Sequence, residues 1–210
     1  MKELFEFDKN YGNVIGTDEA GRGPAAGGVF AAAVYFPEMS DALIVDLERL
    51  NDSKKLSEVA REKLYDIILN NSVNSVVCVE VEEIEKINIL NASLKAMKLA
   101  CENVIKQAGL SEFITLVDGN KLIKNYSYPQ KYIIKGDGKS ASIAAASILA
   151  KVTRDRYMDE LASQFPQYGW NRNSGYLTPE HIKAIDEYGL SKYHRPSFLR
   201  KHFEKQLSLF

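Results

Sequence analysis

Four acidic residues lie at or just past apolar runs that are typical of strands. Asp18 and Glu19 follow the run VIGT, Asp118 follows ITLV, and Asp137 follows KYIIKG. Strand ends of one sheet lie close together, so these carboxylates are expected to converge although they are far apart in sequence. Converging carboxylates repel one another at neutral pH unless cations neutralise them or some keep their protons.

Hard divalent ions such as Mg²⁺ and Mn²⁺ suit such a site because they take oxygen ligands and keep open positions for water and phosphate. A pair of them about 4 Å apart can activate a water on one side of a phosphodiester and stabilise the leaving oxygen on the other. The pattern therefore favours metal-assisted phosphodiester hydrolysis. A turn explains Asp118 or Asp137 alone equally well, whereas the adjacent pair Asp18 and Glu19 is harder to explain in that way.

Two polar segments are further candidates. Gly21, Arg22 and Gly23 lack the Lys-Ser/Thr of a P-loop and the spacing of a dinucleotide fold. Their glycines are expected either to let the backbone approach a substrate or to form a structural turn. The segment NDSKKLS precedes a helix start and is either an anion-binding set or a solvated loop. Its three candidate residues are Asn51, Ser53 and Lys54.

The apolar periodicity predicts the elements that must hold these side chains. Runs at 14–17 and 28–36 predict a hairpin-like pair of strands joined by the glycine loop. A third strand is expected over 75–81, and two more strands run into the Asp-Gly pairs. Helices are predicted over 58–71, over an amphipathic segment from Ile87 that ends at Gly109, over 140–165 and from Pro179. This alternation predicts an α/β layered domain with a mixed sheet.

The composition is that of one ordinary globular domain. The chain has 210 residues, of which 45% are hydrophobic and 26% charged, and its net charge of −1 gives no sign of a polyanion partner. Cys78 and Cys101 lack metal-ligand spacing and are expected to be buried in a reducing compartment. The sequence shows no signal peptide and no long apolar run. We therefore expect a cytoplasmic protein without membrane contact, and nothing demands more than a monomer.

The C-terminal third offers cations and aromatic rings. A locally basic group fits a surface that follows a nucleic-acid backbone, although charge runs are mostly solvated faces. Tyr176 lies in a turn region where a ring can stack on a sugar or base, whereas Tyr168 and Trp170 are expected to fix the loop to the core. The histidines lack metal-ligand spacing and a Ser or Cys nucleophile motif, which argues against nucleophilic catalysis. The basic group comprises Lys139, Lys151, Arg154, Arg156, Lys192, Arg195, Arg200 and Lys201.

A series of motifs runs along the chain in the order GTDEAGRGP, NDSKKLS, VDGN, IKGD, SIAAASILAKVTRDR, FPQYGW and GYLTPEH. In this order they resemble the motifs of the bacterial type 2 ribonuclease H (ribonuclease HII) family. The resemblance covers about residues 14–198 and implies a ribonuclease H-like α/β fold: a mixed β-sheet flanked by helices, with a C-terminal helical extension. The implied division is a catalytic core over 1–165, the extension over 166–205 and a tail over 206–210. Ala25 and Gly138 depart from the family pattern but leave the carboxylates in place.

The resemblance also implies an activity. Members hydrolyse the RNA strand of RNA–DNA hybrids and nick duplex DNA 5′ of a single embedded ribonucleotide, leaving 3′-hydroxyl and 5′-phosphate ends. These reactions serve ribonucleotide excision repair and RNA primer removal. The family's cofactor is a divalent metal, Mn²⁺ or Mg²⁺, and its four metal-binding, catalytic carboxylates fall on Asp18, Glu19, Asp118 and Asp137.

Substrate contacts follow from the same resemblance. The family's loop that contacts the ribonucleotide 2′-hydroxyl, the group that distinguishes RNA from DNA, falls on Gly21, Arg22 and Gly23. A tyrosine that stacks on the neighbouring deoxyribose falls on Tyr176. A phosphate-contact segment falls on Asn51, Ser53 and Lys54.

The last five residues, QLSLF, lie outside this core. They resemble the pentapeptide by which many bacterial replication and repair proteins bind the sliding clamp, because a glutamine with two apolar anchors can fill a hydrophobic groove. An apolar helix end packed on the domain is the alternative. The candidate clamp-binding residues are Gln206, Leu207, Leu209 and Phe210.

Two other function classes fit parts of the pattern. A catalytically silent nucleic-acid or clamp-binding adaptor with the same fold would be indicated by the loss of a carboxylate, and all four are present. A glycosidase with a carboxylate pair needs one protonated acid and no metal, so its activity would survive EDTA. The leading hypothesis is therefore a metal-dependent endonuclease that acts on ribonucleotides within duplexes.

Overall fold

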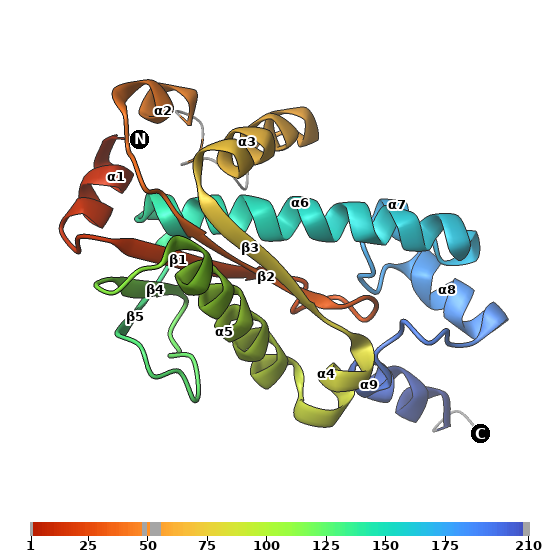
Figure 1. Ribbon diagram of the computed structural model, residues 1–210. Coiled ribbons are helices and arrows are strands. Elements are labelled where there is room, and N and C mark those ends of the chain that lie inside the picture. The colour runs from red at the N-terminus through yellow and green to blue at the C-terminus, as the bar shows by residue number, and fades with distance from the viewer. Residues whose placement is uncertain (1, 48–49, 51–55, 208–210) are drawn as a thin grey trace.

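The computed structural model describes residues 2–47, 50 and 56–207, with the backbone alone at 2, 201, 202 and 205–207. Its strands form one mixed sheet in the order β3-β2-β1-β4-β5 (Figure 1). β1 pairs antiparallel with β2 and parallel with β4. β3 joins β2 antiparallel and β5 joins β4 parallel, which confirms the predicted mixed sheet. The strands are β1 (Val14–Ala20), β2 (Val29–Tyr35), β3 (Val73–Val79), β4 (Ile114–Asp118) and β5 (Gln130–Ile133).

Helices cover both faces of this sheet. α5 (Ile89–Ala108) packs on one face, where β2 presents Ala31 and Ala33 to it, and α6 (Ala141–Gln164) packs on the other, where β2 presents Ala32 and Val34. Alternate strand residues thus enter two separate cores, as the two-residue period of a strand requires. The remaining helices are α1 (Lys2–Lys9), α2 (Asp41–Asp46), α3 (Glu58–Asn71), α4 (Val81–Ile87), α7 (Trp170–Asn173), α8 (Pro179–Tyr188) and α9 (Pro196–Leu207), with 3-10 turns η2 (Gly136–Gly138) and η3 (Pro166–Tyr168).

Small residues let α6 approach β1 closely. A Cβ on Gly16 would overlap the backbone at Ser142 and Ile143, so only glycine fits there. The first turn of α6 is capped from two directions: Ser140 accepts from the Ile143 N–H, and the carboxylate of Asp8 in α1 accepts from the Ser142 N–H at 2.9 Å. The start of α6 is therefore fixed against the strand that carries the acidic pair.

Two predicted boundaries are wrong. The predicted third strand ends at Val79 rather than 81, because Glu80 is the N-cap of α4. The amphipathic segment that was predicted as one helix from Ile87 breaks at Asn88, whose φ is 66° and whose side chain caps α5 by accepting from the Asn91 N–H. The end of that helix at Gly109, in the left-handed region with φ 60°, is confirmed.

A cluster of rings joins the C-terminal segment to the rest of the fold. Tyr168 and Trp170 are buried and stacked, which confirms that they fix the loop to the core. Behind them His181 and His194 face each other, with Nε2 atoms 3.1 Å apart. The Ser191 N–H donates to Nδ1 of His194, and Nδ1 of His181 faces the Tyr176 carbonyl at 2.9 Å. These partners assign the proton to Nε2 of His194 and to Nδ1 of His181, so both rings are neutral.

Acidification is expected to destabilise the protein through this histidine pair. Burial and the neighbouring His181 lower the pKa of His194 to about 4, below the ordinary value near 6.5. The unfolded chain therefore binds more protons between pH 6.5 and 4, and the free energy of unfolding falls by about 1–2 kcal/mol as the pH drops through this window. Urea unfolding of the wild type and of His194→Gln at pH 7.5 and 5 measures this change in the free energy of unfolding. An equal pH dependence in both proteins would contradict the assignment.

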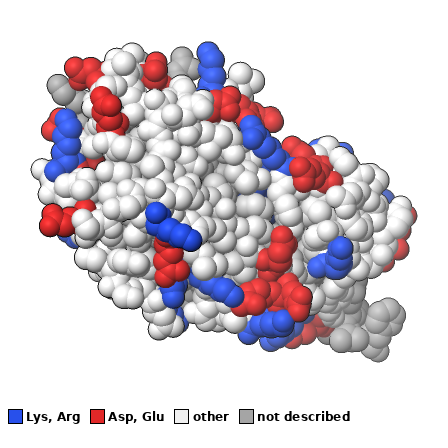
Figure 2. Space-filling model, viewed as in Figure 1, with Lys and Arg blue, Asp and Glu red and all other residues white. Residues whose placement is uncertain are grey.

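The described part of the chain contains no helix that is long and apolar enough to cross a membrane. Seen from the α5 side, acidic and basic side chains are mixed, and no continuous basic patch covers this face (Figure 2). Arg154 and Arg195, which were counted in a basic surface group, are buried with 2% and 0% exposure. That part of the prediction is wrong, since both guanidiniums donate to backbone carbonyls inside the fold.

Candidate active site

The acidic pair lies inside β1 and not past its end. Asp18 pairs with Ala32 and Glu19 with Ala31, because β2 extends the ladder as far as Ala20. Asp and Glu are depleted in strands, but here ladder pairing outweighs intrinsic propensity. On the other side of β1, Thr17 is in register with Val117, so the next residues along the two parallel strands, Asp18 and Asp118, lie side by side.

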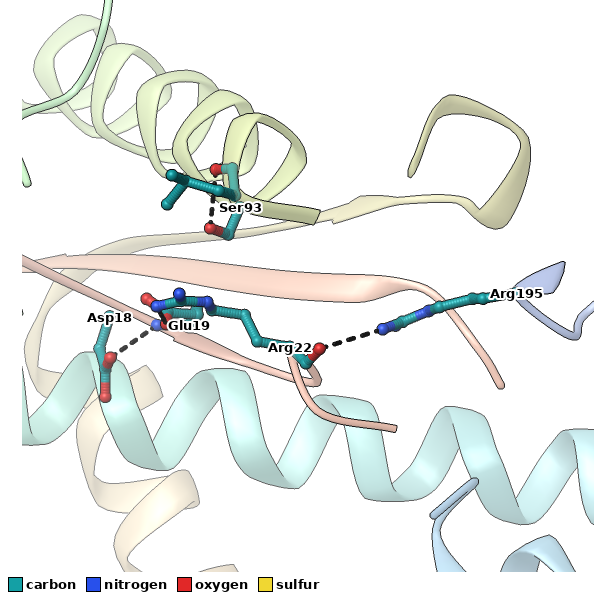
Figure 3. A network of polar contacts seen from close by, with 6 residues as sticks. Asp18, Glu19, Arg22, Ser93 and Arg195 are labelled. Carbon is teal, nitrogen blue, oxygen red and sulfur yellow. Dashed lines mark hydrogen bonds and ion pairs between the residues drawn. The ribbon is translucent and has the colours of Figure 1, made fainter. Parts of the chain in front are cut away.

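The carboxylates of the pair are held in a poorly solvated place. The Asp18 Oδ1 atom accepts from the Glu19 N–H at 2.7 Å, and Glu19 forms an ion pair with Arg22 at 3.0 Å (Figure 3). Burial, then the charges of Glu19 and Asp118, raise the pKa of Asp18 well above its ordinary value, although Ser147 on α6 lowers it. Burial also raises the pKa of Glu19 against the opposing effect of Arg22. The charge of Asp118 therefore disfavours the ionised forms of both Asp18 and Glu19, and the charge of Glu19 adds to this effect on Asp18.

Asp118 and Asp137 come together through the turn η2. The Gly136 N–H donates to the Asp118 Oδ1 atom at 2.6 Å, which places the backbone of Asp137, the next residue, beside the end of β4. A Cβ on Gly136 would lie 2.6 Å from Cδ1 of Ile143 and 3.1 Å from the Asp118 carboxylate. A larger residue at 136 would therefore have to displace the Ile143 side chain and crowd the Asp118 carboxylate.

The donor set suits a hard divalent cation. It consists of carboxylate oxygens whose mutual repulsion a cation would relieve. In the described part of the chain, no three His, Cys, Asp or Glu side chains already stand as a coordination cage. One oxygen of Glu19 accepts from Arg22 and one oxygen of Asp118 accepts from the Gly136 N–H, which leaves the second oxygen of each carboxylate for a cation. Asp18, Glu19 and Asp118 are brought together, and Asp137 is adjacent through its backbone.

A cleft of about 370 Å³ opens beside the acidic pair. It lies between the end of β1, α3, α6 and the loop that precedes α8. The cationic side chains of Arg61 and Lys151 contribute to its wall, which suits a phosphate backbone, whereas the Arg154 that also lines it is buried. The full lining is Glu19, Ala20, Gly21, Arg61, Ser147, Ile148, Lys151, Arg154 and Tyr176.

Two of the predicted substrate-contact residues, Gly21 and Tyr176, line this cleft. Gly21 has φ 97°, a backbone conformation that favours glycine, and a Cβ there would overlap the Arg154 side chain. Both the backbone conformation and the lack of space therefore favour glycine at this position. A Cβ on Gly23 would lie 3.2 Å from the ring of Tyr176. The Tyr176 side chain is 54% exposed, which leaves its ring open to a ligand. The glycine loop and the tyrosine are thus neighbours, although the sequence separates them widely.

Several candidate residues fall elsewhere. Asn51, Ser53 and Lys54 lie outside the described residues, as do Leu209 and Phe210. Gln206 and Leu207 form the last turn of α9, where the backbone alone is described.

Sequence reasoning missed the residues that hold the glycine loop in place. The buried Arg195 donates to the carbonyls of Gly27 and Pro24 at 2.6 and 2.8 Å, and Arg154 donates to the Ala26 carbonyl at 3.2 Å. Arginine is mostly exposed in proteins, so the residue type alone does not predict that these two side chains are buried. The apolar and aromatic neighbours of Arg195 along α9 were the only available signal.

Comparison with known proteins agrees with this geometry. Residues 15–206 match the family model for Ribonuclease HII. The Ribonuclease HII of Fusobacterium nucleatum is 50% identical over 204 residues, which is 97% of this chain and 93% of the relative.

Solved structures give the same result. The ribonuclease H2 from Pyrococcus horikoshii superposes with a TM-score of 0.71 at 27% identity, covering 92% of this chain and 98% of that one. The RNase HII in a PCNA:RNase HII complex from Archaeoglobus fulgidus has a TM-score of 0.70 at 26% identity, with 87% and 93% covered. Sequence, fold and family model agree over nearly the whole chain: it belongs to the ribonuclease HII family.

Proposed function

We propose that this chain is a metal-dependent endoribonuclease that hydrolyses the RNA strand of RNA–DNA hybrids and nicks duplex DNA 5′ of single ribonucleotides. The observation that carries the proposal is the meeting of two groups at one cleft. One is the set of mutually repelling carboxylates on β1 and β4, and the other is the glycine loop in contact with Tyr176. Family membership supports ribonuclease H activity.

The proposed cofactor is Mg²⁺ or Mn²⁺, in a site formed by Asp18, Glu19, Asp118 and Asp137. A bound pair of such ions supplies an activated water and stabilises the leaving oxygen. The chain's own residues orient the rest. Ser147 and the Glu19 N–H hold the Asp18 carboxylate, the Gly136 N–H holds Asp118, and Arg22 holds Glu19 until a cation competes for it.

Substrate recognition is proposed to follow the cleft. Lys151 and Arg61 supply positive charge for a phosphate backbone. Gly21, Arg22 and Gly23 would contact the 2′-hydroxyl and Tyr176 would stack on the neighbouring deoxyribose, so the sugar is tested beside the carboxylates that cut. Asn51, Ser53 and Lys54 are proposed as phosphate contacts on the resemblance alone.

An end-labelled DNA duplex with one ribonucleotide tests this function directly. In Mg²⁺ we expect a single nick 5′ of the ribonucleotide, with a 3′-hydroxyl on the labelled product, sized on a denaturing gel. An all-DNA duplex should stay intact because it lacks the 2′-hydroxyl. Cleavage of long hybrids with the single-ribonucleotide duplex left intact would remove the roles of Gly21, Arg22, Gly23 and Tyr176 and leave the metal site standing.

The C-terminal residues Gln206, Leu207, Leu209 and Phe210 are proposed to bind the bacterial sliding clamp. Their motif supports this, and so does the archaeal RNase HII that was solved with PCNA. Deleting residues 206–210 is expected to abolish clamp binding in surface plasmon resonance and to leave hydrolysis within twofold. Unchanged clamp affinity would remove the proposal.

The silent adaptor is the less supported alternative, because all four carboxylates are present and the charges of Glu19 and Asp118 raise the pKa of Asp18.

We further propose that the enzyme works in the cytoplasm as a monomer in replication and repair, with the core, extension and tail divided as predicted from the sequence. Size-exclusion chromatography with light scattering measures the monomer, and a stable dimer would overturn it.

A further inference from the structure

The loop of residues 22–28 is wrapped around one guanidinium. Arg195 is fully buried, and its Nε and Nη2 atoms donate to the Gly27 carbonyl at 2.9 and 2.6 Å. Nη2 also reaches the Gly28 carbonyl at 3.1 Å. Nη1 donates to the Pro24 carbonyl at 2.8 Å and makes a long contact of 3.5 Å with that of Arg22. Figure 3 shows the resulting chain of polar contacts from Asp18 through Glu19 and Arg22 to Arg195.

A second buried arginine joins this loop to the segment that carries Tyr176. Nη2 of Arg154 donates to the carbonyls of Ala26 and Ser174, at 3.2 and 3.0 Å. The Ala25 N–H donates to the Gly175 carbonyl, one residue before Tyr176. The glycine loop and the tyrosine are therefore held in one hydrogen-bonded frame.

The two buried arginines supply the hydrogen-bond donors for the carbonyls of the loop. Burial and the charge of Arg154 lower the pKa of Arg195 to about 10, and burial also lowers the pKa of Arg154. Keeping both guanidiniums charged inside the fold therefore costs desolvation free energy. Every acceptor recorded for them is a backbone carbonyl. Apolar side chains of similar volume would serve packing at lower cost, but they would leave those carbonyls unsatisfied and the loop without a defined path.

The loop cannot fix its own conformation. Glycines at 23, 27 and 28 give it wide backbone freedom, which folding must remove. In a planar trans peptide the C=O and the following N–H point in opposite directions. Because the Arg22 carbonyl points to Arg195, the Gly23 N–H is directed away from Arg195. The guanidinium thereby sets the direction in which the peptide groups of the loop point.

We infer that Arg195, supported by Arg154, is a positioning residue for ribonucleotide recognition: by holding the carbonyls of the 22–28 loop it fixes the loop beside Tyr176, so that a ribonucleotide is preferred over a deoxyribonucleotide. The inference rests on the proposed function and extends it from the residues that touch the sugar to the residue that places them.

The test measures binding without turnover, in the full chain carrying Asp118→Asn. Fluorescence anisotropy gives Kd for a duplex with one ribonucleotide and for the same duplex in all-DNA form, and the readout is the ratio of the two. This ratio does not depend on the fraction of folded protein. In Arg195→Gln it should fall about tenfold towards one, the effect of misplacing one or two hydrogen bonds. Arg195→Lys, with fewer donors, should be intermediate.

Leu199→Ala is the matched control. Leu199 is fully buried on α9, the helix that begins directly after Arg195, so this change loosens the adjoining helix without touching the loop carbonyls, and the ratio should stay within twofold. If Arg195→Gln does not fold, Arg154→Lys should show the same fall. An unchanged ratio in the arginine variants, or an equal loss in Leu199→Ala, overturns the inference. If the unmodified chain fails to nick the ribonucleotide duplex, the proposed function fails instead; if it nicks but the Asp118→Asn parent shows no preference, the inference alone fails.

Discussion

Asp118→Asn is expected to lower ribonucleotide-dependent cleavage about 10³-fold while the fold is retained. Asparagine keeps the shape of the side chain and an oxygen for the Gly136 N–H, but it loses the negative charge that would hold a divalent cation between β4 and β1. Loss of cation-assisted stabilisation of a phosphodiester transition state costs several kcal/mol, and about 4 kcal/mol corresponds to a 10³-fold lower rate. Single-turnover cleavage of the ribonucleotide duplex measures it.

Glu112→Gln provides the control for Asp118→Asn. Glu112 is an exposed acid just before the same strand, and its replacement should leave the rate within twofold. Circular dichroism and thermal unfolding of both variants establish that the fold is intact. A rate for Asp118→Asn within tenfold of the wild type would remove Asp118 from the proposed metal site.

Removing divalent metal is expected to abolish cleavage altogether. In EDTA the product should fall below detection, and excess Mg²⁺ or Mn²⁺ should restore it. Metal should also raise the unfolding midpoint, because a ligand at 100 times its Kd that binds only the native state adds about 2.7 kcal/mol. Burial and neighbouring charges raise the pKa values of Asp18 and Glu19, so their protons compete with the cation, and the affinity for metal should rise with pH.

Cleavage that persists in EDTA would require a mechanism without metal, such as the acid pair of a glycosidase. A midpoint that does not move with Mn²⁺ would separate catalysis from a resident cation. Calorimetric titration at pH 6 and 8 checks the sign of the pH effect, since tighter binding at pH 6 would contradict proton competition.

The elements whose own residues carry a clear local pattern could be predicted from the sequence. The strand pair around the glycine loop, the strand that ends at Asp118 and the helix that ends at Gly109 each carry apolar periodicity and a terminal signal. The short helix α1 was missed, and with it Asp8, whose carboxylate acts on a helix far along the chain. No local pattern records a cap supplied from another element.

Some residues of the candidate site could likewise be predicted from the sequence, and others could not. The acidic positions could be found because carboxylates after strands are unusual in combination. The roles of Arg154 and Arg195 in holding the glycine loop could not, because the loop carbonyls that they contact lie more than a hundred residues earlier, and a carbonyl is present at every residue. Only the folded chain shows which carbonyls lack a partner in their own segment.

The helix α6 links the two halves of the site. Ser147, Lys151 and Arg154 follow one another at helical spacing along the cleft, from the Asp18 carboxylate to the glycine loop. The amides of this buried central helix should therefore be among the slowest in hydrogen exchange, opening only when the whole domain opens. A fluctuation that unfolds α6 would release both the loop and the acids, so cutting and sugar discrimination should be lost together when this helix opens.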